Sequence, residues 1–179
     1  LDKLCCSPEF LIATGRSINK ERMKDQYVVL RAMAFLMLHR GEFKDIPALQ
    51  YRGDIDDFLA RFMVYVNDNA PEKLIVDYEN LFIRCMQISY DLLGENGFRF
   101  SGNGIRRPIN MPLFEALSYL FSFVPEKIDY TWASRLILDI ESVKEEFDDS
   151  RYFSGNIDST TSVSFRFDRM DKIINRIQL

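Results

Sequence analysis

One arginine, Arg31, lies inside a stretch that is otherwise apolar from Tyr27 to Leu38. An apolar run of this kind belongs in a protein core, and a guanidinium keeps its proton even there. Burying that charge without a partner is costly. The sequence therefore predicts either a buried ion pair at Arg31 or a cation that is directed at a bound group.

Apolar residues recur at intervals of three and four along most of the chain, which is the spacing of amphipathic helices. Gly and Pro are sparse, with eight and six among the 179 residues. We predict a single all-α domain over residues 1–179, an irregular bundle of about seven helices, with at most a short β-like segment near Phe98-Phe100. The expected helices span residues 8–14, 20–40, 55–66, 71–93, 111–121, 131–147 and 159–177.

Four side chains are suited to cap helix starts, namely Ser7, Asn19, Asp54 and Asn110. The acids of the segment Asp54-Ile55-Asp56-Asp57 could alternatively hold a divalent metal. Acids in the first turn of a helix also interact favourably with the positive end of its dipole. We expect capping rather than metal binding at this segment.

The composition restricts the classes of function. A net charge of −4 provides no overall attraction for nucleic acid, so such a contact needs a local basic patch. No apolar run reaches the roughly 18 residues that a membrane helix needs. The three cysteines and the single histidine have no metal-ligand spacing, and we expect reduced thiols in a cytoplasmic protein. The chain begins without Met, and we expect a fragment of a longer protein that binds no cofactor through these residues.

The helix expected at 20–40 carries the first candidate site. At about 100° per residue, Lys20, Lys24 and Arg31 fall within one narrow sector that aromatic residues flank. Basic side chains among aromatic ones contact phosphate backbones and nucleotides. The alternative is that Arg31 lies at the edge of the buried face and pairs with a carboxylate of another helix, such as Asp56, Asp57 or Glu115.

The loop from Gly94 to Asn110 is the second candidate, since it carries Arg99, Arg106 and Arg107 among four glycines. Glycine lets the backbone approach a ligand closely, and arginine binds phosphate through two hydrogen bonds at once. The loop lacks the Gly-Lys-Ser/Thr ending of a P-loop. The alternative is a polar surface loop whose arginines pair with nearby acids.

Two further features carry weaker signals. A basic side of the last expected helix could lie along nucleic acid, but Asp168 and Asp171 dilute it, and we expect a solvated face there. We expect His39 to be structural, with a charge that the nearby helix C-terminus favours. The basic residues of the last helix are Arg166, Arg169, Lys172 and Arg176.

Several short motifs occur in an order that resembles a known family. The motifs are Leu1-Asp2-Lys3-Leu4, Ser7-Pro8-Glu9-Phe10, Arg22-Met23-Lys24-Asp25, Leu30-Arg31-Ala32-Met33-Ala34-Phe35, Tyr51-Arg52-Gly53-Asp54 with Phe58-Leu59, Phe98-Arg99-Phe100, and Arg107-Pro108-Ile109-Asn110 with Leu113-Phe114-Glu115. Over most of the chain, their order and spacing are similar to the helical half of the family called domain of unknown function 262, the N-terminal region of GmrSD-type modification-dependent restriction endonucleases.

The resemblance implies a bacterial DNA-surveillance protein that acts in phage defence. Family members carry an upstream ParB/sulfiredoxin-like domain with an Asp-Gly-Gln-Gln-Arg motif tied to nucleotide binding and hydrolysis, and many end in a His-Asn-His nuclease domain. This sequence has neither, so the chemistry, with nucleotide and Mg²⁺, is expected outside these residues. The recurring polar positions of the family are matched, as structural or interface candidates, by Arg22, Asp25, Arg31, Arg99, Arg107 and Asn110.

We therefore expect a helical module that packs on the upstream domain and couples nucleotide state to DNA engagement, with no catalytic or metal-binding residue of its own. The alternative is a structural or homo-oligomerisation module without nucleic-acid contact, which predicts an exposed apolar patch. The expected contacts to phosphate of DNA or nucleotide come from Arg99, Arg106, Arg107, Lys24 and Arg31. The expected structural polar residues are Arg22, Asp25, Asn110 and Glu115.

Overall fold

The computed structural model describes residues 1–102, 105–150, 153 and 155–177, and over these residues the chain is all-α, as predicted. The described residues form eight α-helices and no strand, and the segment Phe98-Phe100 is a turn rather than a β-like piece. The α-helices are α1 (Asp2–Cys5), α2 (Pro8–Ala13), α3 (Lys24–His39), α4 (Ile55–Asp68), α5 (Glu72–Leu93), α6 (Met111–Phe121), α7 (Tyr130–Asp148) and α8 (Thr160–Ile177). Short 3-10 helices span η1 (Glu21–Met23), η2 (Pro47–Leu49) and η3 (Gly94–Asn96).

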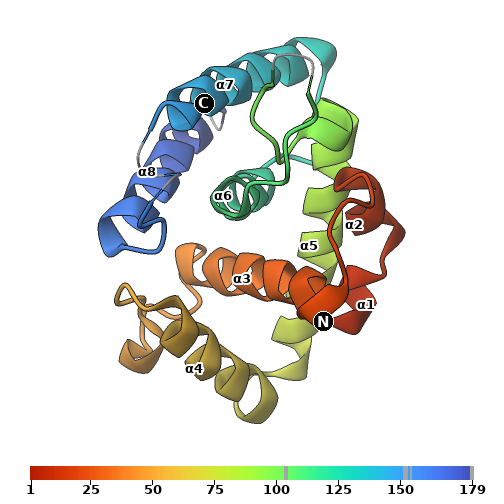
Figure 1. Cartoon of the computed structure of the whole chain (residues 1–179). Helices are drawn as coiled ribbons and strands as arrows, with labels where there is room; N and C mark the ends of the chain where they lie inside the picture. The colour runs from red at the N-terminus through yellow and green to blue at the C-terminus, as the bar shows by residue number, and fades with distance from the viewer. Residues whose placement is uncertain (103–104, 151–152, 154, 178–179) are drawn as a thin grey trace.

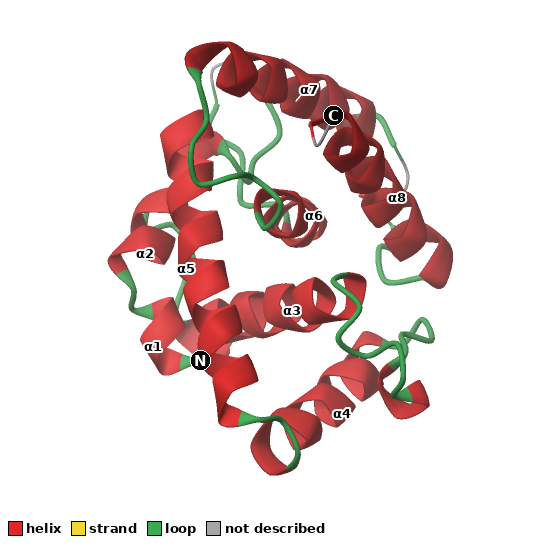
Figure 2. Cartoon of the chain, turned by 180° about the vertical axis from the view of Figure 1, so that it is seen from behind, coloured by secondary structure: helices red, strands yellow, loops and turns green. Residues whose placement is uncertain are grey.

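Helix α6 is the centre of the bundle. It packs against α3, α5 and α8, and every residue from Pro112 to Phe121 is buried. Figure 1 shows α7 and α8 lying over one side of α6, with α3 on the other side and α4 at the far edge. Seen from behind, α5 runs along the flank that α1 and α2 cover (Figure 2). A helix that is apolar around its whole circumference requires such enclosure.

The helix starts follow the expected capping chemistry at three positions. The side chains of Ser7, Asp54 and Asn110 each accept a hydrogen bond from the backbone N–H three residues later, over 3.2, 3.0 and 2.9 Å. Asp129 caps α7 in the same way, with 2.8 Å to the backbone nitrogen of Trp132. These caps satisfy amide groups that the first turn of a helix leaves without partners.

The helix expected from residue 20 starts only at Lys24. Arg22 and Met23 have φ angles of 55° and 56°, in the left-handed region that two consecutive L residues cannot hold inside an α-helix. Asn19 accepts a hydrogen bond from the backbone nitrogen of Glu21 (2.9 Å), so it closes a turn before η1 instead of capping α3. Lys20 therefore does not share a helical face with Arg31.

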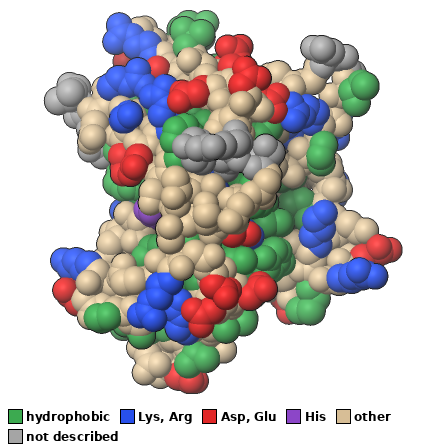
Figure 3. Space-filling view, turned by 60° about the vertical axis from the view of Figure 1, so that its left-hand side comes forward, with side chains coloured by type: hydrophobic (Ala, Val, Ile, Leu, Met, Phe, Trp, Pro, Cys, Tyr) green, Lys and Arg blue, Asp and Glu red, His purple; other side chains and the backbone are tan. Residues whose placement is uncertain are grey.

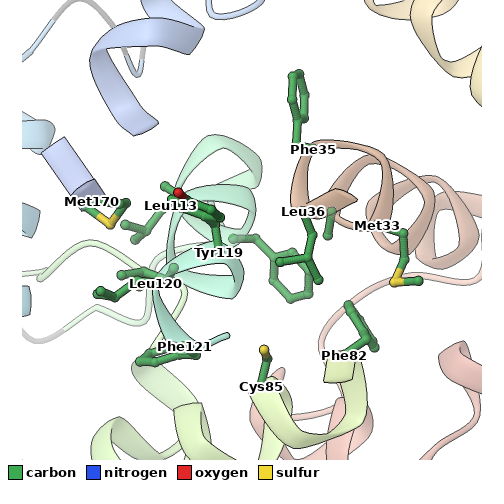
Figure 4. Packing of buried hydrophobic residues seen from close by; sticks show 14 of the residues in the cluster. Met33, Phe35, Leu36, Phe82, Cys85, Leu113, Tyr119, Leu120, Phe121 and Met170 are labelled. Atoms are coloured by element: carbon green, nitrogen blue, oxygen red, sulfur yellow. The ribbon is translucent and has the colours of Figure 1, made fainter. Parts of the chain in front are cut away.

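Aromatic and aliphatic side chains from all eight described α-helices contribute to the core. The Phe35 ring of α3 lies 5.4 Å from the Phe58 ring of α4 and 5.6 Å from the Phe167 ring of α8. Figure 4 shows Leu36 of α3, Cys85 of α5 and Met170 of α8 lying near the side chains of α6. Each buried side chain of this size contributes about 1.5–3 kcal/mol of hydrophobic stabilisation. The core residues drawn there include Met33, Leu36, Phe82, Cys85, Leu120, Phe121 and Met170.

Four charged residues lie among these apolar side chains, and we call them the ion quartet: Arg31, Glu115, Asp158 and Arg166. The carboxylate of Glu115 accepts from Nε of Arg31 at 2.5 Å and from Nη2 of Arg166 at 3.0 Å, and all three side chains are buried. Nη2 of Arg31 also donates to Oδ1 of Asp158 at 2.6 Å. Two cations thus face two anions, and this pairing makes their burial possible.

The environment of Arg31 keeps it charged. Burial by itself lowers its pKa, but the ion pairs and hydrogen bonds with Glu115 and Asp158 raise the pKa above its ordinary value. Tyr51 extends the quartet, since its hydroxyl donates to the backbone carbonyl oxygen of Asp158. Of the three partners expected for Arg31, Glu115 is the one that the structure provides.

Arg166 was expected on a solvated face of the last helix, and this expectation is wrong. Its side chain is 0% exposed, and Nη1 donates to the carbonyl oxygen of Ile157. Val163 and Met170, three residues before and four after it, are buried as well. Arg166 therefore lies on the apolar stripe of α8, while Arg169 and Arg176 face outward.

Replacing Glu115 with Gln keeps the size of the side chain but leaves two buried arginines without their shared anion. We expect the free energy of unfolding to fall by about 3–5 kcal/mol, the usual cost of breaking a buried ion pair. Chemical denaturation followed by circular dichroism measures it. The exposed Glu145→Gln on α7 is the matched control and should change stability by less than about 0.5 kcal/mol. Equal losses in the two variants would contradict a stabilising quartet.

His39 is structural, as expected, but it is uncharged. Its ring stacks on Phe167 with 3.5 Å between ring centroids, and its buried Nε2 has no hydrogen-bond partner. Burial and the neighbouring Arg166 lower the pKa of His39 from 6.5 to about 3. The dipole of α3 therefore does not set its charge, because desolvation is the larger effect.

The lowered pKa of His39 makes stability depend on pH. Below pH 6.5 the unfolded chain binds a proton at His39 and the folded chain does not until about pH 3, so this contribution is present above pH 6.5 and is lost as the pH falls. Compared with His39→Phe, the wild type should lose about 1.4 kcal/mol of unfolding free energy per pH unit between pH 6 and pH 4. Urea denaturation across this range measures the difference. A constant difference would mean that folded His39 has an ordinary pKa.

Candidate functional site

An open cleft of about 610 Å³ lies between α7 and the chain that connects α5 to α6. We call it the arginine cleft. Its described lining contains four cations and two carboxylates, which leaves an excess of two positive charges. The lining residues are Glu95, Asn96, Arg99, Phe100, Ser101, Gly102, Ile105, Arg106, Arg107, Glu141 and Lys144.

Arg99 builds the wall of the cleft. Its side chain is 4% exposed, and its guanidinium donates to the carbonyl oxygens of Thr14 at 3.1 Å and Glu95 at 3.2 Å. It also donates to the carbonyl oxygen of Arg107 and to the hydroxyl of Ser17. Burial and the nearby Arg106 lower its pKa. The donors of Arg99 are thus used to hold the loop, so this side chain positions the cleft rather than offering itself to a ligand.

Arg106 lies at the rim and is about half exposed. Its Nη2 is 2.8 Å from the Glu95 carboxylate, which is itself half exposed. A Cβ atom at Gly15 would lie 1.9 Å from Nη2 of Arg106, and Gly15 has a φ of +59°. Glycine suits this backbone angle and leaves room for Arg106, whose flexible guanidinium a Cβ atom would displace.

Arg107 lies at the part of the cleft rim next to α7, whereas Arg106 lies next to Glu95. Its Nη1 forms an ion pair with Asp148 and donates to the carbonyl oxygen of Ser101 at 3.3 Å. The guanidinium lies over the Phe100 ring, 5.3 Å from its centroid. The hydrogen bond to Asp148 raises the pKa of Arg107, which remains 39% exposed. Both rim arginines thus carry exposed, weakly held carboxylate partners.

Lys144 is the functional candidate that sequence reasoning missed. Only 4% of it is exposed, and its Nζ donates to the carbonyl oxygen of Asn96 at 3.2 Å and to Glu141 at 2.9 Å. Ile140 and Phe147 stand four residues before and three after it on the buried face of α7. This placement was a readable signal, because a lysine on an apolar stripe needs a specific partner.

The other predicted residues lie apart from the cleft lining. Arg31 is enclosed in the ion quartet, while Lys24 and Arg22 are exposed near the start of α3. Asp25 is buried, and its carboxylate accepts from the backbone nitrogen of Gln26. The backbone nitrogen of Asn110 donates to the carbonyl oxygen of Phe98 at 3.0 Å, which ties together the two ends of the cleft loop.

The acids near the start of α4 behave as helix-capping residues. Asp54 caps the helix, and Asp57 forms an ion pair with Arg61 at 2.7 Å. Among the described residues, no group of three or more His, Cys, Asp and Glu side chains is arranged to hold a metal ion. Within the same residues, no helix combines the length and apolar character that crossing a membrane demands.

No family model, curated protein or solved structure matches this chain. The assignment of the site therefore depends on its geometry. Two exposed guanidinium groups, a buried ammonium group and an excess of positive charge around one hollow form an arrangement that can hold an anion through charge-assisted hydrogen bonds.

Arg99→Ala should loosen the wall of the cleft, because the buried carbonyl oxygen of Thr14 and the partly buried ones of Glu95 and Arg107 lose their donor. We expect a fall of about 2–3 kcal/mol in the free energy of unfolding, the cost of leaving such groups unpaired. Arg135→Ala, which removes an exposed arginine from α7, is the control and should stay within about 0.5 kcal/mol of the wild type. Chemical denaturation measures the free energy of unfolding of both variants. Similar unfolding free energies in the two would show that Arg99 does not hold the loop.

Proposed function

We propose that the chain is the helical module of a bacterial, cytoplasmic DNA-surveillance protein of the restriction type. In this proposal the module supports a neighbouring nucleotide-binding domain of the same protein and contributes basic contacts to phosphate of nucleotide or DNA. The ordered motifs that resemble the helical half of the domain of unknown function 262 family support the biological setting. The chemistry of cleavage belongs to other parts of the protein.

The observation that carries the phosphate role is the convergence of Arg106, Arg107 and Lys144 on one open cleft. Of the five residues expected to contact phosphate, Arg106 and Arg107 combine an exposed guanidinium with a place on the cleft wall. Arg31 and Arg99 serve the proposal indirectly, since Arg31 stabilises the bundle and Arg99 shapes the loop. Lys24 lies outside the cleft lining and has no part in this site.

The double variant Arg106→Ala/Arg107→Ala tests this role. We expect it to weaken binding to single-stranded DNA at least about tenfold and to lower the slope of log affinity against log salt, because two cations that contact phosphate are removed. Fluorescence anisotropy over a series of salt concentrations measures both quantities. An affinity and a salt slope equal to those of the wild type would exclude the phosphate role of these arginines.

The matched control is Arg169→Ala/Arg176→Ala on α8. These arginines also form ion pairs with acids, at 2.6 Å to Glu146 and 3.1 Å to Asp139, and do not line the arginine cleft. The change in net charge is the same in both double variants. The control arginines line a hollow of their own, so an equal loss of affinity in the two would show that the arginine cleft is not a specific phosphate site.

One observation favours the alternative of an oligomerisation module. Helix α4 exposes Met63 and Val64, at 41% and 57%, and Met63 borders a groove of about 380 Å³ that apolar side chains of α1, α3, α4 and α5 line. Exposed apolar surface of this kind marks interaction sites. A mass in sedimentation that rises with concentration and returns to the monomer value in Met63→Glu would support this function.

A further inference from the structure

Carboxylates surround the arginine cleft. Glu95 stands at its rim with 54% of the side chain exposed, and Glu141 of α7 lines it with 40% exposed. Glu145 and Asp148 are further exposed acids on α7, and the exposed Asp149 directly follows that helix. Acids of α7 therefore border the positive charge of this cleft. A second hollow, between α7 and α8, has the same excess of two positive charges, since Arg169, Lys172 and Arg176 line it with one carboxylate.

The ring of acids discriminates between two kinds of phosphate. An internal phosphate of a nucleic-acid strand has a charged phosphate on either side, and these neighbours would lie against the acidic surface. A terminal phosphate has a neighbour on one side at most, and it carries about 1.5–2 negative charges at neutral pH. The described lining has an excess of two positive charges, which matches such a dianion once Asp148 has released Arg107.

The other charges of the molecule point the same way. The chain carries a net charge of −4. On the face shown in Figure 3, Lys and Arg side chains lie interspersed with Asp and Glu and form no continuous basic track. A protein that follows a phosphate backbone needs such a track, because each additional phosphate contact adds affinity.

We propose that the arginine cleft binds one terminal phosphate group, a phosphate monoester or the end of a diphosphate, as found on a free nucleotide or at the end of a strand. The proposal rests on the phosphate role argued above and narrows its ligand. Lys144 supplies a fixed ammonium group in the wall, held by Asn96 and Glu141. The guanidinium groups of Arg106 and Arg107 leave the carboxylates of Glu95 and Asp148 and turn to the phosphate oxygens.

The exchange of partners is energetically reasonable. Exposed ion pairs such as Arg106 with Glu95 contribute little, since water competes for both groups. A phosphate dianion offers three oxygens and a higher charge than a carboxylate, so it forms stronger hydrogen bonds with the same guanidinium groups. Glu95 and Asp148 therefore act as exchangeable partners that hold the rim arginines in place when the cleft is empty.

The experiment compares pairs of probes that differ only in a terminal phosphate. The first pair is a short oligothymidylate with a 5′-phosphate and the same oligomer with a 5′-hydroxyl, both carrying a fluorophore at the 3′ end. The second pair is ADP and adenosine, measured by calorimetry. The proposal predicts that the phosphorylated member of each pair binds at least about tenfold more tightly. This difference in affinity is what the charge-assisted hydrogen bonds to one phosphate group would provide.

Two variants connect the preference to the cleft. Arg106→Gln/Arg107→Gln should abolish it, whereas Arg169→Gln/Arg176→Gln should leave it intact. Glu95→Gln/Asp148→Asn removes the competing carboxylates and should tighten binding of the phosphorylated probes severalfold, a gain that a misfolded variant cannot produce. Weaker binding in this last variant would overturn the proposal.

The outcomes separate this proposal from the broader phosphate role. One outcome is equal affinity for the two oligomers, with both affinities lowered by the Arg106/Arg107 substitutions. It would show that the cleft binds internal phosphates. The broader phosphate role would then stand, and the terminal-phosphate proposal would be wrong. A preference that is the same in the Arg106→Gln/Arg107→Gln variant and the wild type would place the site elsewhere and overturn both. Absence of binding by all four probes would also overturn both.

Discussion

A single carboxylate, that of Glu115, neutralises guanidinium groups from two helices that are distant in sequence. Arg31 belongs to α3 and Arg166 to α8, and α6 between them carries the acid. All three side chains lie in a core where an uncompensated charge would be prohibitive. Hydrophobic contacts supply the bulk of the stabilisation, but they tolerate sliding and rotation of helices. The ion pairs do not, and they fix the depth and rotation at which α3 and α8 pack on α6.

Much of the fold followed from local sequence. The helical periodicity and the caps at Ser7, Asp54 and Asn110 were readable before the structure, whereas Glu115 was only one of three carboxylates expected as a partner of Arg31. The start of α3 was not, because the left-handed turn at Arg22 is a backbone property without a glycine to mark it. The burial of Arg166 could have been inferred, since it stands on the stripe of Val163 and Met170. Its basic neighbours concealed that position.

The candidate site was predictable in part. The loop with Arg99, Arg106 and Arg107 was identified from composition, and the structure brings all three to one cleft. The three arginines differ in burial and in hydrogen bonding, and these differences depend on partners that are remote in sequence. Thr14 and Ser17 accept hydrogen bonds from Arg99, while Asp148 forms an ion pair with Arg107. A pattern within one loop contains no information on those partners. The proposed exchange, in which Arg106 and Arg107 leave their carboxylate partners for a phosphate, depends on groups that only the folded chain brings together.

The two oppositely charged pairs of the ion quartet are synthesised one after the other, because they lie in different parts of the sequence. Arg31 and Glu115 both precede Asp158 and Arg166 along the chain. Each half of the quartet is therefore electrically neutral by itself. A nascent chain whose last helix is still inside the ribosome can bury the first pair without an unbalanced charge, and the second pair then arrives as a neutral unit. This division of charge lets α3 and α6 associate during translation before α8 docks on α6 and completes the ion quartet.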